Sequence, residues 1–300
     1  MTSPAIDIRG LTKAFGTTTV IDGIDLTVPR GEIFALLGPN GAGKTTIINI
    51  LTTLVRPDTG TAGVCGLDVA ADAVGVRTRI GLTGQSAAVD DALSATENLV
   101  MFGRLSGLGR SAARHRADEM LARFDLADVA ARRVRTFSGG MRRRLDLALS
   151  FVVAPEVLFL DEPTTGLDMH SRRELWSVIR SLASAGTTVF LTTQYLEEAD
   201  QLADRIAVLH GGRIAALGTA ADLKSRVGGD AVELRSPDGR LLDQLPTDGT
   251  VRGLRAALDE LDERGADGVI ALRRPTLDDV FLAVTAPSAA PRADIRPEAS

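Results

Sequence analysis

Short apolar runs alternate with segments of helical periodicity through the first two thirds of the chain. Glu32–Gly38, Val157–Leu160 and Val189–Leu191 contain continuous apolar runs, which are typical of strands buried on both faces. Between the last two runs, apolar residues recur at helical spacing over 175–182, and Gly186 follows as a helix stop signal. This order of strand, helix and strand predicts an α/β domain with a mainly parallel sheet.

Other patterns surround this predicted core. The first thirty residues alternate loosely between apolar and polar positions, which predicts an antiparallel sheet. Residues from about 86 to 135 have helical patterns and many charges, so we expect an inserted helical subdomain within a first domain over 1–227. Residues 228–285 predict a small α+β extension, and the Pro-containing segment 286–300 is expected to be disordered. The extension's predicted elements are strands at 231–235 and 269–272 and helices at 251–263 and 277–284.

Composition restricts the kind of protein. The chain is 44% hydrophobic and 24% charged, as in ordinary globular proteins. Its net charge of −5 gives no basic excess, so we expect no nucleic-acid partner. Cys65 alone cannot form an intramolecular disulfide. We see no signal peptide, and the longest apolar stretch, Leu145–Leu160, is interrupted by charges and a proline. We therefore expect no membrane-spanning segment.

Residues 38–46 match the phosphate-binding pattern G-x-x-x-x-G-K-[ST] and lie between a predicted strand and a predicted helix. Glycines let consecutive backbone N–H groups surround phosphates, and the helix N-terminus adds a positive dipole. Lys44 can reach the β- and γ-phosphates, and Thr45 can supply a hydroxyl to Mg²⁺. The predicted nucleotide contacts are Gly38, Pro39, Asn40, Gly41, Ala42, Gly43, Lys44, Thr45 and Thr46. The apolar face of the helix that follows is predicted to be Ile47, Ile50, Leu51 and Leu54.

Two carboxylates follow the apolar run at 157–160. In α/β sheets, ligands bind at the carboxyl ends of the strands, and Asp161 and Glu162 occupy that position. We predict that Asp161 holds Mg²⁺, through water, and that Glu162 is the general base or polarises the attacking water.

A second predicted anion site begins at Ser138. Ser138 is a natural N-cap for a helix whose inner face is 145–152, and Gly139 and Gly140 allow close backbone approach. One nucleotide needs only one γ-phosphate site, so a second site suggests that it serves the nucleotide of another protomer. We interpret the arginine run 142–144 as a solvated helix face.

Together, Gly38–Thr46, Ser138–Gly140 and Leu160–Asp168 resemble the Walker A, signature, and Walker B with D-loop motifs of ABC-type ATPases, in that order. The resemblance covers about residues 5–225. It implies a P-loop NTPase fold of the ABC type, with an antiparallel β subdomain and a helical insert. It also implies a head-to-tail homodimer that holds two ATP molecules between Walker A of one chain and the signature of the other.

The resemblance also assigns roles outside these motifs. Gln85 matches the Q-loop residue that senses Mg²⁺ and water and couples to membrane partners. Phe15 is placed like the aromatic residue that stacks on adenine, and Asp168 matches the D-loop residue that reaches across the dimer. The switch position, usually His, is Gln194. The implied catalytic set is therefore Glu162, Gln85, Gln194 and Lys44, with Thr45, Gln85 and Asp161 at the metal.

Two departures from the usual ABC motifs indicate a particular subfamily. The signature reads Phe-Ser-Gly-Gly-Met over 137–141 instead of Leu-Ser-Gly-Gly-Gln, and Gln194 replaces the switch His. With Met141–Asp146 and Arg274–Phe281, these features resemble the ATPase subunits of daunorubicin-resistance-type multidrug exporters. The extension between Gly228 and Arg274 looks short for that type.

The expected function is ATP hydrolysis coupled to efflux of a hydrophobic drug or antibiotic. An integral membrane permease would bind this cargo and supply the pathway, and the ATPase dimer would be peripheral on the cytoplasmic face of the plasma membrane. Alternatives are ABC ATPases for lipid, polysaccharide or ion export, and a non-transport ABC ATPase acting on DNA or ribosomes. The DNA-repair type needs a long coiled coil between Walker A and the signature, and the ribosome type usually has two ATPase halves in one chain. The sequence has neither feature.

Overall fold

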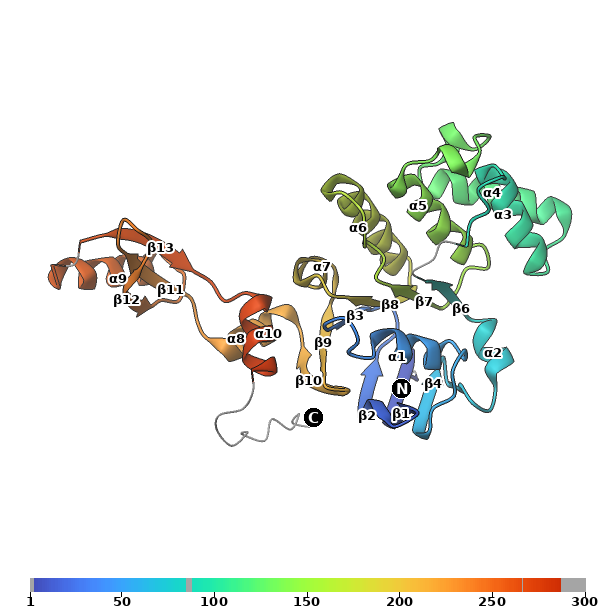
Figure 1. The fold of residues 1–300 in the computed structure, drawn as a ribbon. Coiled ribbons are helices and arrows are strands. Elements are labelled where there is room, and N and C mark those ends of the chain that lie inside the picture. Colours follow the sequence, from blue (N-terminus) through green and yellow to red (C-terminus); the bar gives the residue numbers. More distant parts are fainter. Residues whose placement is uncertain (1–2, 85–87, 266, 287–300) are drawn as a thin grey trace. The chain divides into compact units, whose positions relative to one another are not determined.

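The computed structural model describes residues 3–84, 88–265 and 267–286. These residues belong to two compact units, Met1–Ala220 and Ala221–Ser300 (Figure 1). The first unit has two sheets and the second has one among the described residues, and each unit is described separately below. Within the described residues, no helix has both the length and the apolar content that a membrane span requires.

The first unit contains a six-stranded sheet. Its strands lie in the order β10-β9-β3-β8-β7-β6, and all adjacent pairs are parallel except β10 with β9. The predicted mainly parallel sheet is therefore confirmed. The strands are β3 (Ile33–Leu37), β6 (Ile80–Thr83), β7 (Val157–Asp161), β8 (Thr188–Thr193), β9 (Arg205–His210) and β10 (Arg213–Gly218).

The antiparallel sheet predicted at the start of the chain is also present. It has four strands in the order β2-β1-β4-β5. Its strands are β1 (Ile6–Phe15), β2 (Thr18–Val28), β4 (Thr59–Val64) and β5 (Leu67–Asp68). The helices of the first unit are α1 (Lys44–Leu51), α2 (Ala73–Arg77), α3 (Ala95–Leu105), α4 (Arg110–Arg123), α5 (Gly139–Ser150), α6 (Met169–Ser184) and α7 (Leu196–Leu202), with 3₁₀ turns η1 (Ala127–Val129) and η2 (Val134–Thr136).

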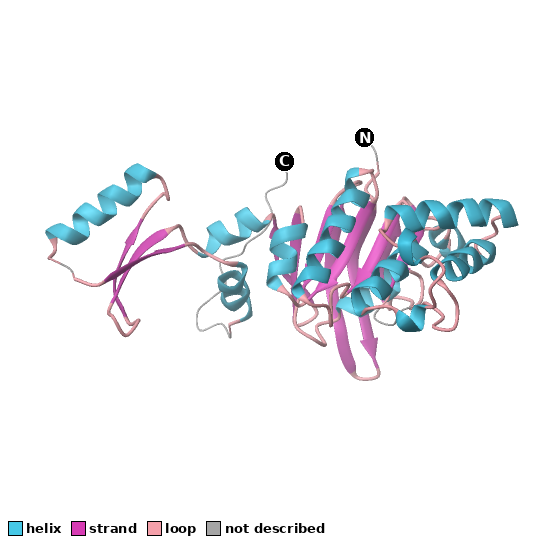
Figure 2. Cartoon of the chain, turned by 90° about the horizontal axis from the view of Figure 1, so that it is seen from above, coloured by secondary structure: helices cyan, strands magenta, loops and turns pink. Residues whose placement is uncertain are grey.

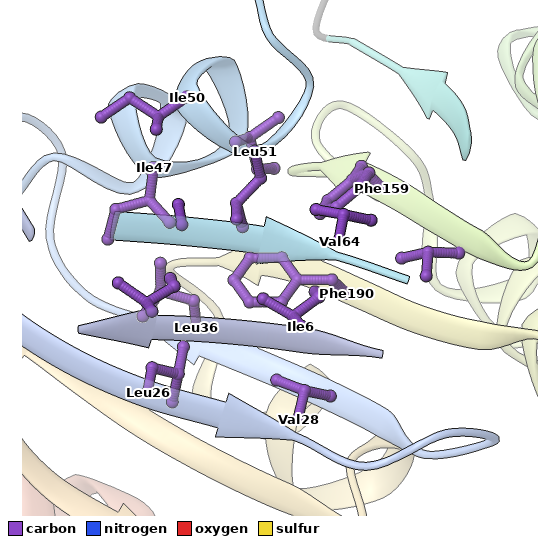
Figure 3. Close-up of a cluster of buried hydrophobic side chains, with 14 of the residues drawn as sticks. Ile6, Leu26, Val28, Leu36, Ile47, Ile50, Leu51, Val64, Phe159 and Phe190 are labelled. Carbon is purple, nitrogen blue, oxygen red and sulfur yellow. The ribbon is translucent and has the colours of Figure 1, made fainter. Parts of the chain in front are cut away.

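One hydrophobic cluster joins α1 to both sheets of the first unit (Figure 3). Ile47 and Leu51 of α1, Ile6 of β1 and Phe159 and Phe190 of β7 and β8 are all fully buried in it. At about 25 cal/mol per Å² of apolar surface, full burial of each such side chain contributes about 1.5–3 kcal/mol. This packing fixes the position of α1 relative to the ends of β7 and β8, and therefore of the phosphate-binding loop relative to Asp161.

Most local predictions hold, and one is wrong. Gly186 has φ 99° just after α6, as a residue that ends a helix requires. Leu54, however, is not part of the buried face of α1. The helix ends at Leu51 and Thr53 adopts φ 66°, so Leu54 is 63% exposed.

The second unit contains a three-stranded antiparallel sheet, β12-β11-β13, with α9 along one face (Figure 2). Val232, Leu234 and Leu245 pack with Ala257 and Leu261 of α9. The elements are α8 (Ala220–Val227), β11 (Ala231–Arg235), β12 (Leu241–Pro246), α9 (Val251–Glu263), β13 (Val269–Arg273) and α10 (Leu277–Thr285). The predicted boundary at 227/228 stays a prediction, and the predicted disorder of 286–300 concerns residues that, apart from Ala286, lie outside the described ones.

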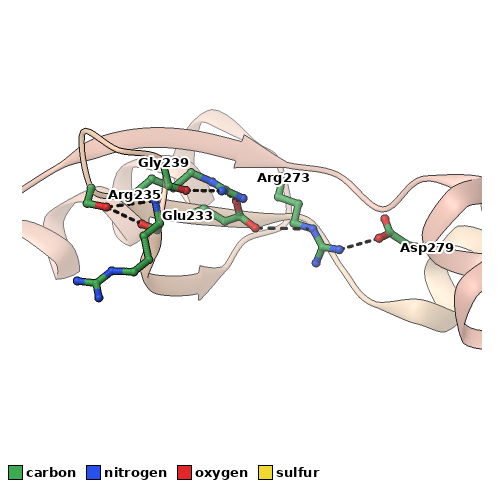
Figure 4. Close-up of polar contacts among 7 residues, drawn as sticks. Glu233, Arg235, Gly239, Arg273 and Asp279 are labelled. Atoms are coloured by element: carbon green, nitrogen blue, oxygen red, sulfur yellow. Dashed lines mark hydrogen bonds and ion pairs between the residues drawn. The ribbon is translucent and has the colours of Figure 1, made fainter.

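A buried carboxylate of this small sheet, Glu233, contacts two arginine side chains. Glu233 is 5% exposed and accepts hydrogen bonds from Arg235, at 2.9 Å from Nε and 2.6 Å from Nη2. Arg273 lies 3.6 Å from the other Glu233 oxygen and also donates to Asp279 of α10 at 2.8 Å (Figure 4). The Arg273 guanidinium therefore ties the start of α10 to β13 and β11.

Candidate functional site

The phosphate-binding loop connects β3 to α1, as its motif predicts. Gly43 precedes the helix with φ 106°, and a Cβ there would lie 2.7 Å from Ile21 Cδ1. Any side chain at this position would therefore clash with β2 as well as strain the backbone. The Lys44 side chain folds back over the loop, and its Nζ donates to the Gly38 carbonyl at 2.8 Å and to the Pro39 carbonyl at 3.1 Å.

Asp161, at the end of β7, receives two hydroxyl hydrogen bonds. Thr45 Oγ1 donates to Oδ2 at 2.9 Å, and Thr192 Oγ1 of β8 donates to Oδ1 at 2.6 Å. The contact between Asp161 and Thr45 joins the Walker B strand to the first turn of α1. A hydroxyl and a carboxylate side by side are the oxygen ligands that Mg²⁺ prefers, and it usually takes few protein ligands and keeps several waters. Within the described residues, no cluster of three or more His, Cys, Asp or Glu side chains could hold a metal by itself.

Glu162 follows in an uncommon backbone conformation, with φ 48°. Its N–H donates to both the carbonyl and the hydroxyl of Thr192, each at 3.1 Å, which stabilises this conformation. The side chain is directed back to the loop, where Oε1 lies 3.2 Å from Lys44 Nζ, and Thr165 Oγ1 donates to Oε2 at 3.3 Å.

Glu162 lines two cavities of the first unit. One, of about 360 Å³, is otherwise lined by the phosphate-binding loop and Val20. The other, of about 290 Å³, lies between the start of α5 and the segment after Glu162. Its remaining lining residues are Gly139, Arg142, Arg143, Thr165, Gly166 and Leu167. The carboxylate therefore faces both the Walker A cavity and the signature side of the same chain.

Phe15 lies at the end of β1 and is 52% exposed, so its ring is available for stacking. Lys13 Nζ lies 5.4 Å from the centre of this ring and is held by Asp58, whose Oδ1 is 2.6 Å away. Asp58 also accepts from the Ala14 N–H at 2.7 Å. These contacts hold the strand end that carries Phe15, and the hydrogen bond from Lys13 lowers the pKa of Asp58.

The signature segment begins α5 as its sequence predicts. Ser138 is the N-cap, and its Oγ accepts from the Met141 N–H at 3.2 Å. The D-loop residue Asp168 caps α6 in the same way, accepting from the N–H of Ser171 at 2.9 Å and from its hydroxyl at 3.0 Å. The backbone hydrogen bond from Ser171 lowers the pKa of Asp168. Ser138 and Gly139 are exposed.

Gln194 lies directly after β8, whose neighbour β7 carries Asp161. It is partly buried. Gln85 lies outside the described residues, so its predicted role stays a prediction. The roles predicted for the other site residues also stay predictions, although the fold brings Lys44, Thr45, Asp161 and Glu162 together.

One interpretation of the sequence is wrong. The arginine run 142–144 is not a uniformly solvated helix face, because the side chains of Arg143 and Arg144 are only 12% and 14% exposed. Arg143 reaches backbone carbonyls on neighbouring segments, and Arg144 contacts Asp125 at 3.0 Å. Sequence periodicity identified the apolar face of α5 but did not show that arginines beside it turn inward. One feature of the sequence could have indicated a buried arginine. Asp146 is a charged residue within the apolar stretch Leu145–Leu149, and a buried carboxylate needs a cationic partner.

Comparisons with known proteins agree with this geometry. A family model described as ABC transporter matches residues 21–165. The chain is 52% identical, over 95% of its length and 97% of the relative's, to "Daunorubicin resistance ATP-binding protein DrrA3" of Streptomyces coeruleorubidus. It is 50% identical to "Daunorubicin/doxorubicin resistance ATP-binding protein DrrA" of Streptomyces peucetius, over 94% of this chain and 92% of the relative.

Solved structures share the fold. A structure titled "Structure of ATP binding subunit of ABC transporter" matches with a TM-score of 0.66 and 26% identity, covering 74% of this chain and 92% of that one. A cbiO1 structure from Clostridium perfringens matches with a TM-score of 0.70, over 74% of this chain and 91% of that one. At 23% identity, the second likeness concerns the fold alone. The chain belongs to the ABC transporter ATP-binding proteins, and it is the ATP-hydrolysing subunit of such a transporter.

Proposed function

We propose that two copies of this chain bind two ATP molecules head to tail, each between the phosphate-binding loop of one protomer and Ser138–Gly140 of the other. The observation that carries the proposal is the lining of the cavity at the phosphate-binding loop, which includes Lys44 and Glu162 but none of Ser138–Gly140. A signature that contacts the nucleotide there would therefore come from another copy of the chain. The exposed N-terminus of α5 offers free N–H groups and a positive dipole to an anion.

The residues of each site would divide the work. Lys44 and the loop N–H groups hold the β- and γ-phosphates, and Phe15 stacks on the base. The carboxylate of Glu162 takes a proton from water as the water oxygen bonds to the γ-phosphorus. The bond from that phosphorus to the bridging oxygen then breaks, which gives ADP and phosphate.

Thr45 and Asp161 are the residues that would hold Mg²⁺, with Gln85 added by the family resemblance. Their hydroxyl and carboxylate oxygens fit this ion, as argued above. When bound, Mg²⁺ neutralises developing negative charge on the phosphate oxygens. The hydrogen bond from the Thr192 hydroxyl orients the Asp161 carboxylate, so this carboxylate is in position before the nucleotide binds.

The proposed cargo is a hydrophobic drug or antibiotic that a separate integral membrane permease binds. This rests on relatives named for daunorubicin or doxorubicin resistance that are about half identical over nearly the whole chain. We place the ATPase peripherally on the cytoplasmic face of the plasma membrane. A relative named "Nod factor export ATP-binding protein I" from Burkholderia lata is 40% identical, which keeps a different exported cargo as the second candidate.

The proposal is tested with the Glu162→Gln variant. It should bind ATP, hydrolyse it about 10² to 10⁴ times more slowly, and accumulate as an ATP-bound dimer in size-exclusion chromatography with multi-angle light scattering. Glu119→Gln changes an exposed carboxylate of α4 and is the matched control, with normal turnover expected. Wild-type turnover in Glu162→Gln, or a monomer at saturating ATP, would overturn the composite site.

The cargo is tested separately in inside-out vesicles that contain the permease. ATP should drive doxorubicin into vesicles carrying the wild-type chain but not into those carrying Glu162→Gln. ATP hydrolysis without doxorubicin uptake would leave the ATPase assignment intact and overturn the proposed cargo.

A further inference from the structure

The Arg143 guanidinium is nearly buried and donates to the backbone of two separate segments. Its Nε lies 2.8 Å from the carbonyl oxygen of Pro163, and its Nη1 lies 2.8 Å from that of Gly84. Its Nη2 is 3.4 Å from the carbonyl oxygen of Asp161. One side chain of α5 therefore connects the end of β7 to the segment that follows β6.

Asp146, one turn further along α5, completes this arrangement. Its Oδ2 lies 3.2 Å from Arg143 Nη1, and its Oδ1 accepts from the Ala88 N–H at 2.8 Å. Asp146 is 3% exposed. We call Arg143 and Asp146 the α5 clamp. The clamp holds Gly84 through the arginine and Ala88 through the aspartate, so it ties these two residues to the helix that starts at the signature.

We propose that the α5 clamp positions the backbone around Glu162 for ATP hydrolysis, so that Arg143 and Asp146 are positioning residues. This rests on the proposed function, because it assumes that Glu162 is the catalytic base. Pro163 is the next residue after Glu162, and Asp161 is the residue before it. A rigid link from these flanking residues to α5 would hold the base and the signature helix at a fixed separation.

The chemistry of the clamp favours this role over simple stabilisation. Both side chains are largely withdrawn from water, and this burial lowers the pKa of Arg143 and raises the pKa of Asp146. A buried ion pair of this kind contributes little net stability compared with apolar residues of similar volume. The planar guanidinium can instead donate to several acceptors in fixed directions, which suits the holding of backbone carbonyls in place.

The test separates positioning from stability by removing one partner and then both. Arg143→Met should lower the melting temperature, because Asp146 loses its buried partner, and should lower kcat on the order of 10- to 100-fold. Arg143→Met with Asp146→Leu removes both charged groups, so much of the thermal stability should return. The kcat of the double variant should stay low, because the hydrogen bonds to Gly84 and Pro163 remain absent and the one from Ala88 to Asp146 is lost as well. ATP affinity should change less than about threefold in both variants, since Lys44 and its loop are untouched.

Arg116 provides a matched control. This arginine of α4 also donates to two backbone carbonyls, those of Phe151 and Val152 at 2.9 Å each, and to Glu119. Arg116→Met should lower the melting temperature and leave kcat unchanged. If the double clamp variant recovers kcat together with stability, or if Arg143→Met keeps wild-type kcat, the positioning role is wrong. Glu162→Gln, measured in parallel, tests the proposed function itself: normal turnover in that variant would contradict the base and not the clamp.

Discussion

Lys44 and Glu162 form an ion pair in which Nζ lies 3.2 Å from Oε1, with side chains only 4% and 12% exposed. The cation that is predicted to bind the phosphates of ATP is therefore held by the carboxylate that is predicted to activate water. We predict that nucleotide phosphates and Glu162 compete for the same ammonium group.

Glu162→Gln should therefore bind ATP several times more tightly than the wild type, because the neutral amide competes less well for Lys44. Equilibrium titration with a fluorescent ATP analogue measures this effect independently of hydrolysis. Weaker binding in the variant would show that the ion pair helps to preorganise the loop and does not compete with nucleotide.

Lys44 and Ser138 are predicted to act on the same ATP from different chains. Lys44→Ala and Ser138→Arg should each impair ATPase activity as homodimers, because every site then lacks one half. Mixing the two variants should yield heterodimers with one intact composite site and partial ATP binding. Full activity in each variant alone would contradict the sandwich arrangement.

Gln194 is predicted to contact the γ-phosphate without acting as an acid or a base. Gln194→Ala should lower the ATPase rate about tenfold or more, as for the loss of one charge-assisted hydrogen bond of about 1.5–3 kcal/mol. Gln194→His should keep activity and add a limb to the pH–rate profile near neutral pH, because imidazole titrates at about 6.5. An alanine variant as fast as the wild type would eliminate the contact.

The connection to the membrane is predicted to run through a partner, by way of the Gln85 region and the helical insert. When expressed alone, the chain should stay in the supernatant after ultracentrifugation of a cell lysate. When coexpressed with its permease, it should sediment with the membranes. Sedimentation with membranes in the absence of any permease would contradict this prediction.

Cys65 should react slowly with alkylating reagents. It is 5% exposed, and burial raises the pKa of its thiol to about 11. At pH 8 a thiol with a pKa of about 9 is about 10% thiolate, whereas one with a pKa of about 11 is about 0.1% thiolate, and the thiolate is the reactive form. The Cys65 thiol loses its proton at a lower pH in the unfolded chain than in the folded one. The free energy of unfolding should therefore fall as the pH rises above about 9. Mass spectrometry after iodoacetamide treatment, with a urea-unfolded control, measures the difference. Equal rates in both samples would refute the protection.

The features best predicted from sequence are those that one segment specifies by itself. The strands β7 and β8 are buried on both faces, so their apolar runs are unambiguous, and Ser138 caps α5 through its own hydroxyl. The sequence does not predict β12, because Leu241 and Leu242 are exposed and the segment has no clear alternation of apolar and polar residues. Arg143 was misinterpreted because its acceptors, Gly84 and Pro163, are distant in sequence and are backbone atoms. No pattern of side chains in the sequence predicts a contact between an arginine and distant backbone carbonyls.

Gly140 links two segments that the proposed dimer would present to the other protomer. A Cβ at this position would lie 2.6 Å from Ser171 Oγ, and Ser171 is the residue bonded to Asp168. The first turn of the signature helix and the D-loop therefore touch within one chain. In a head-to-tail pair, binding of one ATP that shifts the signature would also shift Asp168. Asp168 is predicted to extend toward the second ATP site of the dimer. The two ATP sites would then be coupled. The dimer with two bound ATP molecules would differ in conformation from the dimer with one.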